Sequence, residues 1–125
     1  FIFIFSAYVA GEQEGLILEK QYRMGETLNG VSGLDIFTEK KLLEDTLEHL
    51  SSHNCSKEHI RKTMKDLGIQ RARTFGWPNT YVFTKAMGEM LLGDMKRNVP
   101  LVIIRPAIVT STFKEPFPGW IEGVR

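Results

Sequence analysis

Phe1-Ile2-Phe3-Ile4-Phe5 opens the sequence, and a second apolar run, Leu101-Val102-Ile103-Ile104, follows Pro100. Both runs are short and rich in β-branched or aromatic residues, which is typical of strands covered on both faces in a parallel sheet. Arg105-Pro106 ends the second run, because proline has no N–H for the strand ladder. Helical patterns lie between the two runs. A strand, intervening helices and a second strand form a crossover, so the sequence predicts an α/β fold with a parallel sheet.

Two amphipathic helices are predicted in the middle of the chain. The first spans Thr38 to Leu50 and places a charged face opposite a leucine stripe, made by Leu42, Leu43, Leu47 and Leu50. The second begins after a cap at Ser56 and ends at Gly68, the usual kind of residue at a helix stop. Its shorter apolar stripe contains Ile60, Met64 and Leu67.

A third helix is predicted over residues 81–96, after a cap at Asn79 or Thr80. Its apolar side is made by Met87, Met90, Leu91 and Met95. Gly88 and Gly93 each lower helix propensity by about 1 kcal/mol, so we expect close packing at both. Residues 11–37 show no clean period, and Leu16-Ile17-Leu18 is a candidate for one short strand there.

Composition excludes several classes of protein. A formal charge of +1 provides no global basic field, so nucleic acid is not a predicted partner. The single Cys55 excludes an internal disulfide framework and a cysteine-rich zinc site, and we predict no metal. No apolar run approaches the roughly 20 residues of a membrane span. The first residues have neither Met nor a basic region, so they indicate a buried strand rather than a signal peptide, and we expect the chain to be a fragment.

The strongest chemical signal is a tyrosine and a lysine that share a helical face. Tyr81 and Lys85 are four residues apart on the third helix. Ligands in parallel sheets bind beyond the carboxyl ends of strands, where Ser6 and Pro106 lie. A phenol beside an ammonium can act as a general acid toward a carbonyl oxygen, and the Ser6 hydroxyl could hold the same oxygen. On spacing alone, a surface contact between Tyr81 and Lys85 is the favoured explanation of the pair, and the order of the surrounding elements is what favours a catalytic one.

The order of these elements resembles the extended short-chain dehydrogenase/reductase family. The resemblance is carried by three stretches, Gly76-Trp77-Pro78-Asn79-Thr80-Tyr81-Val82-Phe83-Thr84-Lys85-Ala86-Met87-Gly88-Glu89, Ile103-Ile104-Arg105-Pro106 and Glu115-Pro116-Phe117-Pro118-Gly119-Trp120-Ile121. Together they are similar to the alcohol-forming fatty acyl-CoA reductases of the plant male-sterility type. The resemblance covers all 125 residues. It implies a Rossmann-like, doubly wound parallel sheet with a helical insert at approximately residues 12–70.

The resemblance also implies a reaction and roles for individual residues. The family uses NADPH to reduce a long-chain acyl-CoA to a primary alcohol and releases coenzyme A. Tyr81 would be the proton donor, Lys85 would hold the nicotinamide ribose, and Ser6 would polarise the carbonyl. The nicotinamide side would be lined by Pro106, Ala107, Ile108 and Val109. Relatives resembling this chain occur at the endoplasmic reticulum and in plastids, which are the expected cellular addresses.

The sequence contains no Gly-x-x-Gly-x-x-Gly loop, which in this family binds the cofactor phosphates at a helix start. The predicted Rossmann-like fold is therefore partial, and the 125 residues alone are expected to be inactive. Two alternative functions stay open. One is an extended short-chain reductase or epimerase acting on a nucleotide sugar, and the other is a non-catalytic binding module.

A basic stretch between Lys57 and Arg73 has three interpretations. It contains Arg61, Lys62 and Lys65, and residues 56–125 carry twelve basic and six acidic side chains. The cations could attract the phosphates of coenzyme A or an anionic membrane surface, which would allow peripheral membrane association. They could equally form the solvated face of an amphipathic helix. Oligomeric state has no signature in the sequence.

Overall fold

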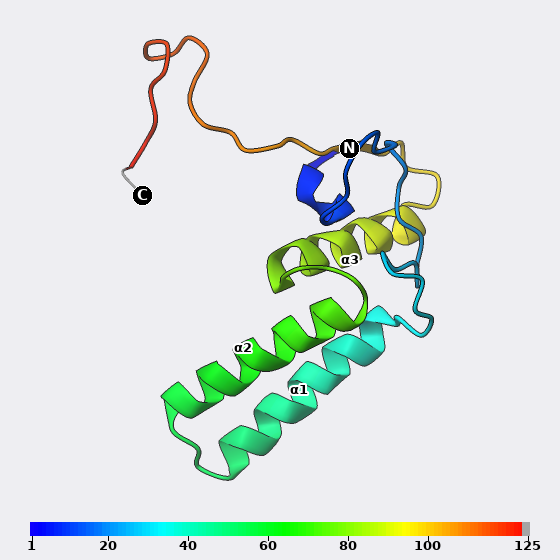
Figure 1. Ribbon diagram of the computed structural model, residues 1–125, viewed down its shortest axis with the longest axis vertical. Helices are drawn as coiled ribbons and strands as arrows, with labels where there is room; N and C mark the ends of the chain where they lie inside the picture. Colours follow the sequence, from blue (N-terminus) through cyan, green and yellow to red (C-terminus); the bar gives the residue numbers. More distant parts are fainter. Residues whose placement is uncertain (124–125) are drawn as a thin grey trace.

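The structure of the protein is a computed structural model that describes residues 1–123 (Figure 1). Its elements follow the predicted order, with one addition: a short 3₁₀ helix, η1, follows the first strand. In chain order they are β1 (Ile2–Ile4), η1 (Ala7–Ala10), α1 (Ile36–Ser52), α2 (Lys57–Thr74), α3 (Thr80–Met95) and β2 (Val102–Ile104). The predicted α/β class is confirmed.

The sheet contains two parallel strands that lie side by side. Its register pairs Ile2 with Val102, Phe3 with Ile103 and Ile4 with Ile104. Both strands are shorter than predicted. The expectation of burial on both faces is wrong for the described residues, because Ile2, Ile4, Val102 and Ile104 are all exposed while Phe3 and Ile103 are half-buried. Side chains alternate across a strand, so only one face of this sheet is partly covered.

The hydrophobic core surrounds the first half of α3 and the turn that precedes it. Trp77 is completely buried, and its ring centroid lies 5.3 Å from that of Phe83, which also stacks on Phe75 at 5.8 Å. The chain segments that meet here are η1, the start of α1, the end of α2 and α3. The buried members are Val9, Leu34, Ile36, Ala72, Phe75, Trp77, Val82, Phe83, Ala86 and Met90.

Helices α1 and α2 form an antiparallel hairpin that extends away from α3 (Figure 1). Arg71 on α2 makes two hydrogen bonds to the buried Glu39 on α1, at 2.8 and 2.6 Å. The predicted leucine stripe is only partly correct, because Leu50 is buried but Leu42 and Leu47 are exposed. The hairpin is only two helices thick, so α1 has too few neighbours to cover a stripe of that width.

The predicted end of the second helix at Gly68 is wrong. Ser56 caps α2 as expected, by accepting from the His59 N–H at 3.2 Å, but the helix continues to Thr74. A β-carbon on Gly68 would lie 3.1 Å from the Thr80 hydroxyl oxygen at the start of α3. The glycine therefore permits two helices to approach closely, which a sequence pattern cannot distinguish from a helix stop.

Asn79 caps α3, and its side chain accepts from the Val82 N–H at 3.1 Å. Close packing at both glycines is confirmed, since Gly88 faces the Phe5 ring and Gly93 faces the Gln21 side chain. Met95 is exposed, contrary to the predicted apolar side, because it lies in the last turn, beyond the reach of the core.

Residues 11–35 form a long loop with no strand, so the candidate at Leu16-Ile17-Leu18 is wrong. These side chains are exposed and have no neighbouring strand to pair with. The loop is attached instead through specific bonds to the turn after α2, where the Leu28 N–H donates to Phe75 and the Asn29 amide donates to Thr74. Among residues 1–123, no helix is both long and apolar enough to cross a membrane.

Candidate functional site

The carboxyl ends of both strands meet at one edge of the sheet. The Phe5 N–H donates to the Ile104 carbonyl at 2.8 Å, and the Ala7 N–H donates to the Pro106 carbonyl at 2.9 Å. The two chains therefore remain paired for a few residues past the strands. This pairing places Ser6 and Arg105-Pro106 at the same edge, where ligands of parallel sheets bind.

Ser6 is buried, and its hydroxyl already has one partner. Its oxygen accepts from the Tyr8 N–H at 3.3 Å and so caps η1. A hydroxyl has one hydrogen to donate in addition to its acceptor lone pairs. The cap occupies a lone pair and leaves the hydroxyl hydrogen available for a substrate oxygen.

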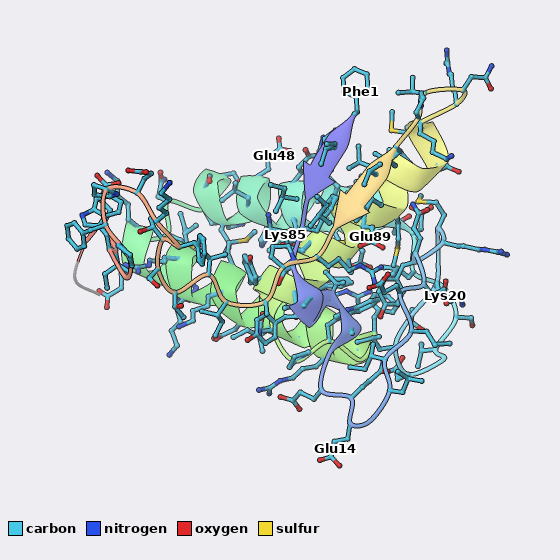
Figure 2. All side chains as sticks on the ribbon, turned by 90° about the horizontal axis from the view of Figure 1, so that it is seen from above. Phe1, Glu14, Lys20, Glu48, Lys85 and Glu89 are labelled. Atoms are coloured by element: carbon cyan, nitrogen blue, oxygen red, sulfur yellow. The ribbon has the colours of Figure 1, made fainter. Side chains whose placement is uncertain are left out.

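Tyr81 and Lys85 lie in the first turns of α3, and Lys85 is beside the exit of β1 (Figure 2). The Lys85 ammonium lies 5.8 Å from the centroid of the Tyr81 ring and 6.0 Å from that of the Phe5 ring. Both distances are within the range of cation–π attraction, so Lys85 is held between the helix and the strand end. Tyr81 is 57% exposed, which leaves its phenol accessible to a bound molecule.

The structure thus brings Lys85 and Tyr81 together next to the residue that precedes Ser6. Pro106 is half-buried at the same edge, and its carbonyl is used by Ala7. Ala107, Ile108 and Val109 follow in an exposed segment without regular structure that leaves the sheet. Any contact that these three residues make with a ligand therefore comes from an exposed, irregular segment and not from the sheet.

The basic residues of α2 lie elsewhere. Arg61, Lys62 and Lys65 are exposed in the half of α2 that is remote from α3 (Figure 1). At a rise of 1.5 Å per residue, Arg61 lies roughly 20 Å along the helix axis from its C-terminal end. The structure therefore does not bring these cations to Tyr81. Within the described residues, none of the three forms an ion pair.

Sequence reasoning missed an ion pair between α3 and the end of β2. Arg105 Nε donates to Glu89 Oε2 at 2.8 Å, and Nη2 donates to both Glu89 Oε1 and the Lys20 carbonyl. Glu89 has no solvent exposure. Hydrogen bonding to Glu89 raises the pKa of the Arg105 guanidinium, which therefore keeps its positive charge. A lone carboxylate inside an apolar helix stretch, between Met87 and Met90, was the signal that could have revealed it.

The same pair organises the long loop. The Tyr22 N–H donates to Glu89 Oε1 at 3.3 Å, and the Arg105 guanidinium lies 5.4 Å from the Tyr22 ring centroid. Burial raises the pKa of the Tyr22 phenol, which therefore stays neutral. A cavity of about 600 Å³ adjoins Glu89 and Arg105 and is bounded by η1 and residues 17–21. Tyr81 is not part of its lining and lies on open surface.

The chain has a parallel sheet, and the helix between its strands presents Tyr81 and Lys85, with Lys85 close to the strand end that precedes Ser6. These features place the chain in the class of Rossmann-like NAD-binding domains. Comparison with known families agrees. The chain belongs to the family described as "Male sterility protein", whose model is one of an NAD-binding domain and matches residues 1–125. The resemblance inferred from the sequence is confirmed, and a nicotinamide cofactor is supported in this general sense.

Curated relatives give the same result. The chain is 62% identical over 125 residues to an alcohol-forming fatty acyl-CoA reductase of Simmondsia chinensis, covering 100% of the chain and 25% of the relative. It is 59% identical over 120 residues to fatty acyl-CoA reductase 1 of Arabidopsis thaliana, covering 96% and 24%. Fatty acyl-CoA reductase 2, chloroplastic, of the same plant is 46% identical over 132 residues, covering 100% and 21%. The chain spans about a quarter of the length of these relatives.

Proposed function

We propose that residues 1–125 belong to an NADPH-dependent reductase that converts a long-chain fatty acyl-CoA into a primary alcohol and releases coenzyme A. The observation that carries this proposal is the position of Lys85 between Tyr81 and the strand end that carries Ser6. The names of the relatives supply the substrate class, since they are fatty acyl-CoA reductases and one is alcohol-forming.

The residues at the strand edge match what the two reductions require. Each reduction would use the hydride of one NADPH, so two NADPH molecules would bind in turn. The first addition places a negative charge on the thioester oxygen, to which the Ser6 and Tyr81 hydroxyls donate hydrogen bonds. Collapse of this adduct breaks the carbon–sulfur bond and expels the coenzyme A thiolate, leaving an aldehyde. After the second addition, the Tyr81 phenol gives its proton to the alkoxide and forms the alcohol.

The site fits the nicotinamide end of the cofactor. The exposed Tyr81 phenol and the adjacent Lys85 ammonium provide a donor and a cation for a ribose, and the carbonyl of Pro106 lies at the same edge. The sequence has no Gly-rich phosphate loop, so residues outside this chain would hold the pyrophosphate. We include in this proposal a doubly wound Rossmann-like sheet, with residues 12–70 as a helical insert.

The cations of α2 have a role that their distance from Tyr81 allows. The phosphates of coenzyme A lie at the far end of a long, flexible arm from the thioester. Arg61, Lys62 and Lys65 are exposed and lie well away from the chemistry along α2, so they can attract those phosphates while the thioester reaches Tyr81. A nucleotide sugar lacks such an arm, and the comparisons favour the acyl-CoA substrate over it.

The cellular address belongs to the proposal as well. The endoplasmic reticulum and the plastid are the two expected locations, and one relative carries the word chloroplastic in its name. Peripheral contact of the basic face of α2 with an anionic membrane is compatible with either. A fluorescent fusion of the complete protein, co-imaged with markers of both compartments, separates the two.

The proposed function is tested by giving the complete reductase NADPH with palmitoyl-CoA or with a nucleotide sugar. We expect hexadecanol and free coenzyme A from the first substrate and no NADPH oxidation with the second. Both products are measured, because a hydrolase would release coenzyme A without forming the alcohol. NADPH oxidation with only the nucleotide sugar would contradict the proposal.

A further inference from the structure

A carboxylate on α3 could bind the Lys85 ammonium in place of the aromatic rings that the ammonium contacts. Glu89 follows Lys85 by four residues on α3, a spacing at which a lysine and a glutamate share a helical face and commonly pair. They form no ion pair in the structure, although both side chains are described. The ammonium instead points to the rings of Tyr81 and Phe5. Figure 2 shows Lys85 beside the end of β1.

The carboxylate of Glu89 is fully engaged by other groups. Its two oxygens accept from Nε and Nη2 of Arg105, and Oε1 also accepts from the Tyr22 N–H. A bidentate guanidinium contact of this kind is strong and directional. Arg105 is itself held by the Lys20 carbonyl and the Tyr22 ring, so it cannot easily release the carboxylate.

We propose that Arg105 is a positioning residue that keeps Glu89 away from Lys85, so that the ammonium remains beside Tyr81. This inference rests on the proposed function, because it concerns the same site. Without Arg105, a buried carboxylate would be left without a counter-charge, which is strongly unfavourable. The nearest remedy is the ammonium four residues away on the same helix. Capture by Glu89 would remove Lys85 from both the cofactor ribose and Tyr81.

A purely structural ion pair makes a different prediction. If the pair only holds α3 against β2, loss of either partner breaks the same contact, and the two single variants should behave alike. If Arg105 protects Lys85, the partners are not equivalent. Arg105→Gln leaves a carboxylate that can capture the lysine, whereas Glu89→Gln removes that carboxylate. The asymmetry between two variants of one ion pair is therefore the diagnostic measurement.

The experiment measures NADPH affinity by calorimetry and aldehyde reduction by absorbance, in the complete reductase. For Arg105→Gln we expect affinity to fall by about tenfold or more, the scale of one lost charged contact, whereas Glu89→Gln stays within about threefold of wild type. As a second readout, the Lys85 amine should react more slowly with an amine-modifying reagent in Arg105→Gln than in wild type. Lys96, which has no ion pair among the described residues, provides the internal reference.

The double variant Glu89→Gln with Arg105→Gln keeps the test decisive if Arg105→Gln does not fold. It contains no unpaired buried charge, and we expect it to recover NADPH affinity to the level of Glu89→Gln. A structural role predicts the same recovery, because removing both charges relieves the unpaired buried carboxylate, but it predicts one unchanged rate of Lys85 modification in wild type, Arg105→Gln and the double variant. Arg71→Gln is the matched control, because it breaks the comparable Arg71–Glu39 pair, and Glu39 has no lysine four residues before it.

The outcomes separate this inference from the proposed function. A wild-type protein that neither binds NADPH nor reduces palmitoyl-CoA contradicts the proposed function. If the wild-type protein does both, two results overturn the role of Arg105 and leave the proposed function standing. One is an equal loss in Arg105→Gln and Glu89→Gln, and the other is a double variant that binds NADPH no better than Arg105→Gln. Slower modification of Lys85 in Arg105→Gln, with a return to the wild-type rate in the double variant and with Arg71→Gln unchanged in affinity, supports it.

Discussion

The indole N–H of Trp77 donates to the main-chain carbonyl of Val9 at 2.9 Å, and both residues are completely buried. This bond joins the turn before α3 to η1, the short helix that Ser6 caps. It is one of the contacts that set the position of Ser6 relative to Tyr81, because each lies only a few residues from one of the bonded partners. The Trp77 ring also packs against Phe83 on α3.

Trp77→Phe should therefore reduce both stability and activity. Phenylalanine retains an aromatic ring but leaves the buried Val9 carbonyl without its donor, which costs about 1–3 kcal/mol. We expect a lower midpoint in chemical denaturation and a lower kcat for aldehyde reduction. Trp120→Phe is the control, because Trp120 lies in the tail and bonds to Thr112 through its main chain. Equal effects of the two substitutions would show that η1 does not depend on the indole.

Tyr81→Phe tests the proposed proton donor. The ring and its contact with Lys85 remain, while the hydroxyl is lost, and removing a positioned general acid lowers the rate by about 10²–10⁴-fold. This corresponds to roughly 3–5 kcal/mol of activation free energy. We expect the main loss in kcat for a free fatty aldehyde, with the denaturation midpoint little changed and NADPH affinity lowered only by the one hydrogen bond that the phenol gives to the ribose, about tenfold at most.

Tyr8→Phe is a suitable control for that variant. Tyr8 is also about half exposed, and it lies next to the strand edge, in η1. Its phenol makes no hydrogen bond among the described residues, so its loss should leave aldehyde reduction near the wild-type rate. If Tyr81→Phe retains more than about a tenth of that rate, Tyr81 is not the general acid in the sense of the proposed mechanism.

The basic face of α2 should affect the coenzyme A substrate alone. Arg61→Ala with Lys62→Ala and Lys65→Ala should raise KM for palmitoyl-CoA and leave the kinetics of a free aldehyde unchanged, because the aldehyde has no phosphates. The double variant Lys40→Ala with Lys41→Ala removes exposed cations from α1 and serves as the control. A similar rise in KM for both substrates would instead identify the face as merely solvated.

Much of the fold could be predicted because it depends on local patterns. Several features are each visible within a few residues of sequence: the two apolar runs, the caps at Ser56 and Asn79, and the spacing of Tyr81 and Lys85. The errors arose where distant segments meet. Gly68 faces Thr80 across two helices, and the partner of Glu89 is Arg105, sixteen residues away and just past the end of β2. No periodicity within a single helix contains such information.

Residues 11–35 show the same limit more strongly. The loop has no period, yet its main chain is fixed at Tyr22 by Glu89 and at Leu28 by the Phe75 carbonyl. Each bond joins positions at least 47 residues apart in the sequence. The apolar Leu16-Ile17-Leu18 run indicated a strand, but a strand needs a hydrogen-bonded neighbour, and whether one is present is decided by the tertiary structure.

The start of α1 should respond to pH through its cap. Asp35 accepts from the Thr38 N–H at 2.6 Å, and this main-chain hydrogen bond is the main reason that the pKa of Asp35 lies below its ordinary value. A carboxyl group whose pKa is lower in the folded state stabilises that state above its unfolded pKa, near 4, and this contribution is lost as the pH falls through the folded pKa. Protection of the Thr38 and Glu39 amides from hydrogen exchange, relative to intrinsic rates, should therefore decrease as the pH falls below about 4. Asp35→Asn should remove this pH dependence while retaining protection, because asparagine caps a helix without titrating.

The cap of α2, where Ser56 accepts from the His59 N–H, contains no titrating cap residue and provides an internal control. If the protection of the Thr38 amide falls with acid equally in wild type and in Asp35→Asn, the charge of the cap does not contribute to stability.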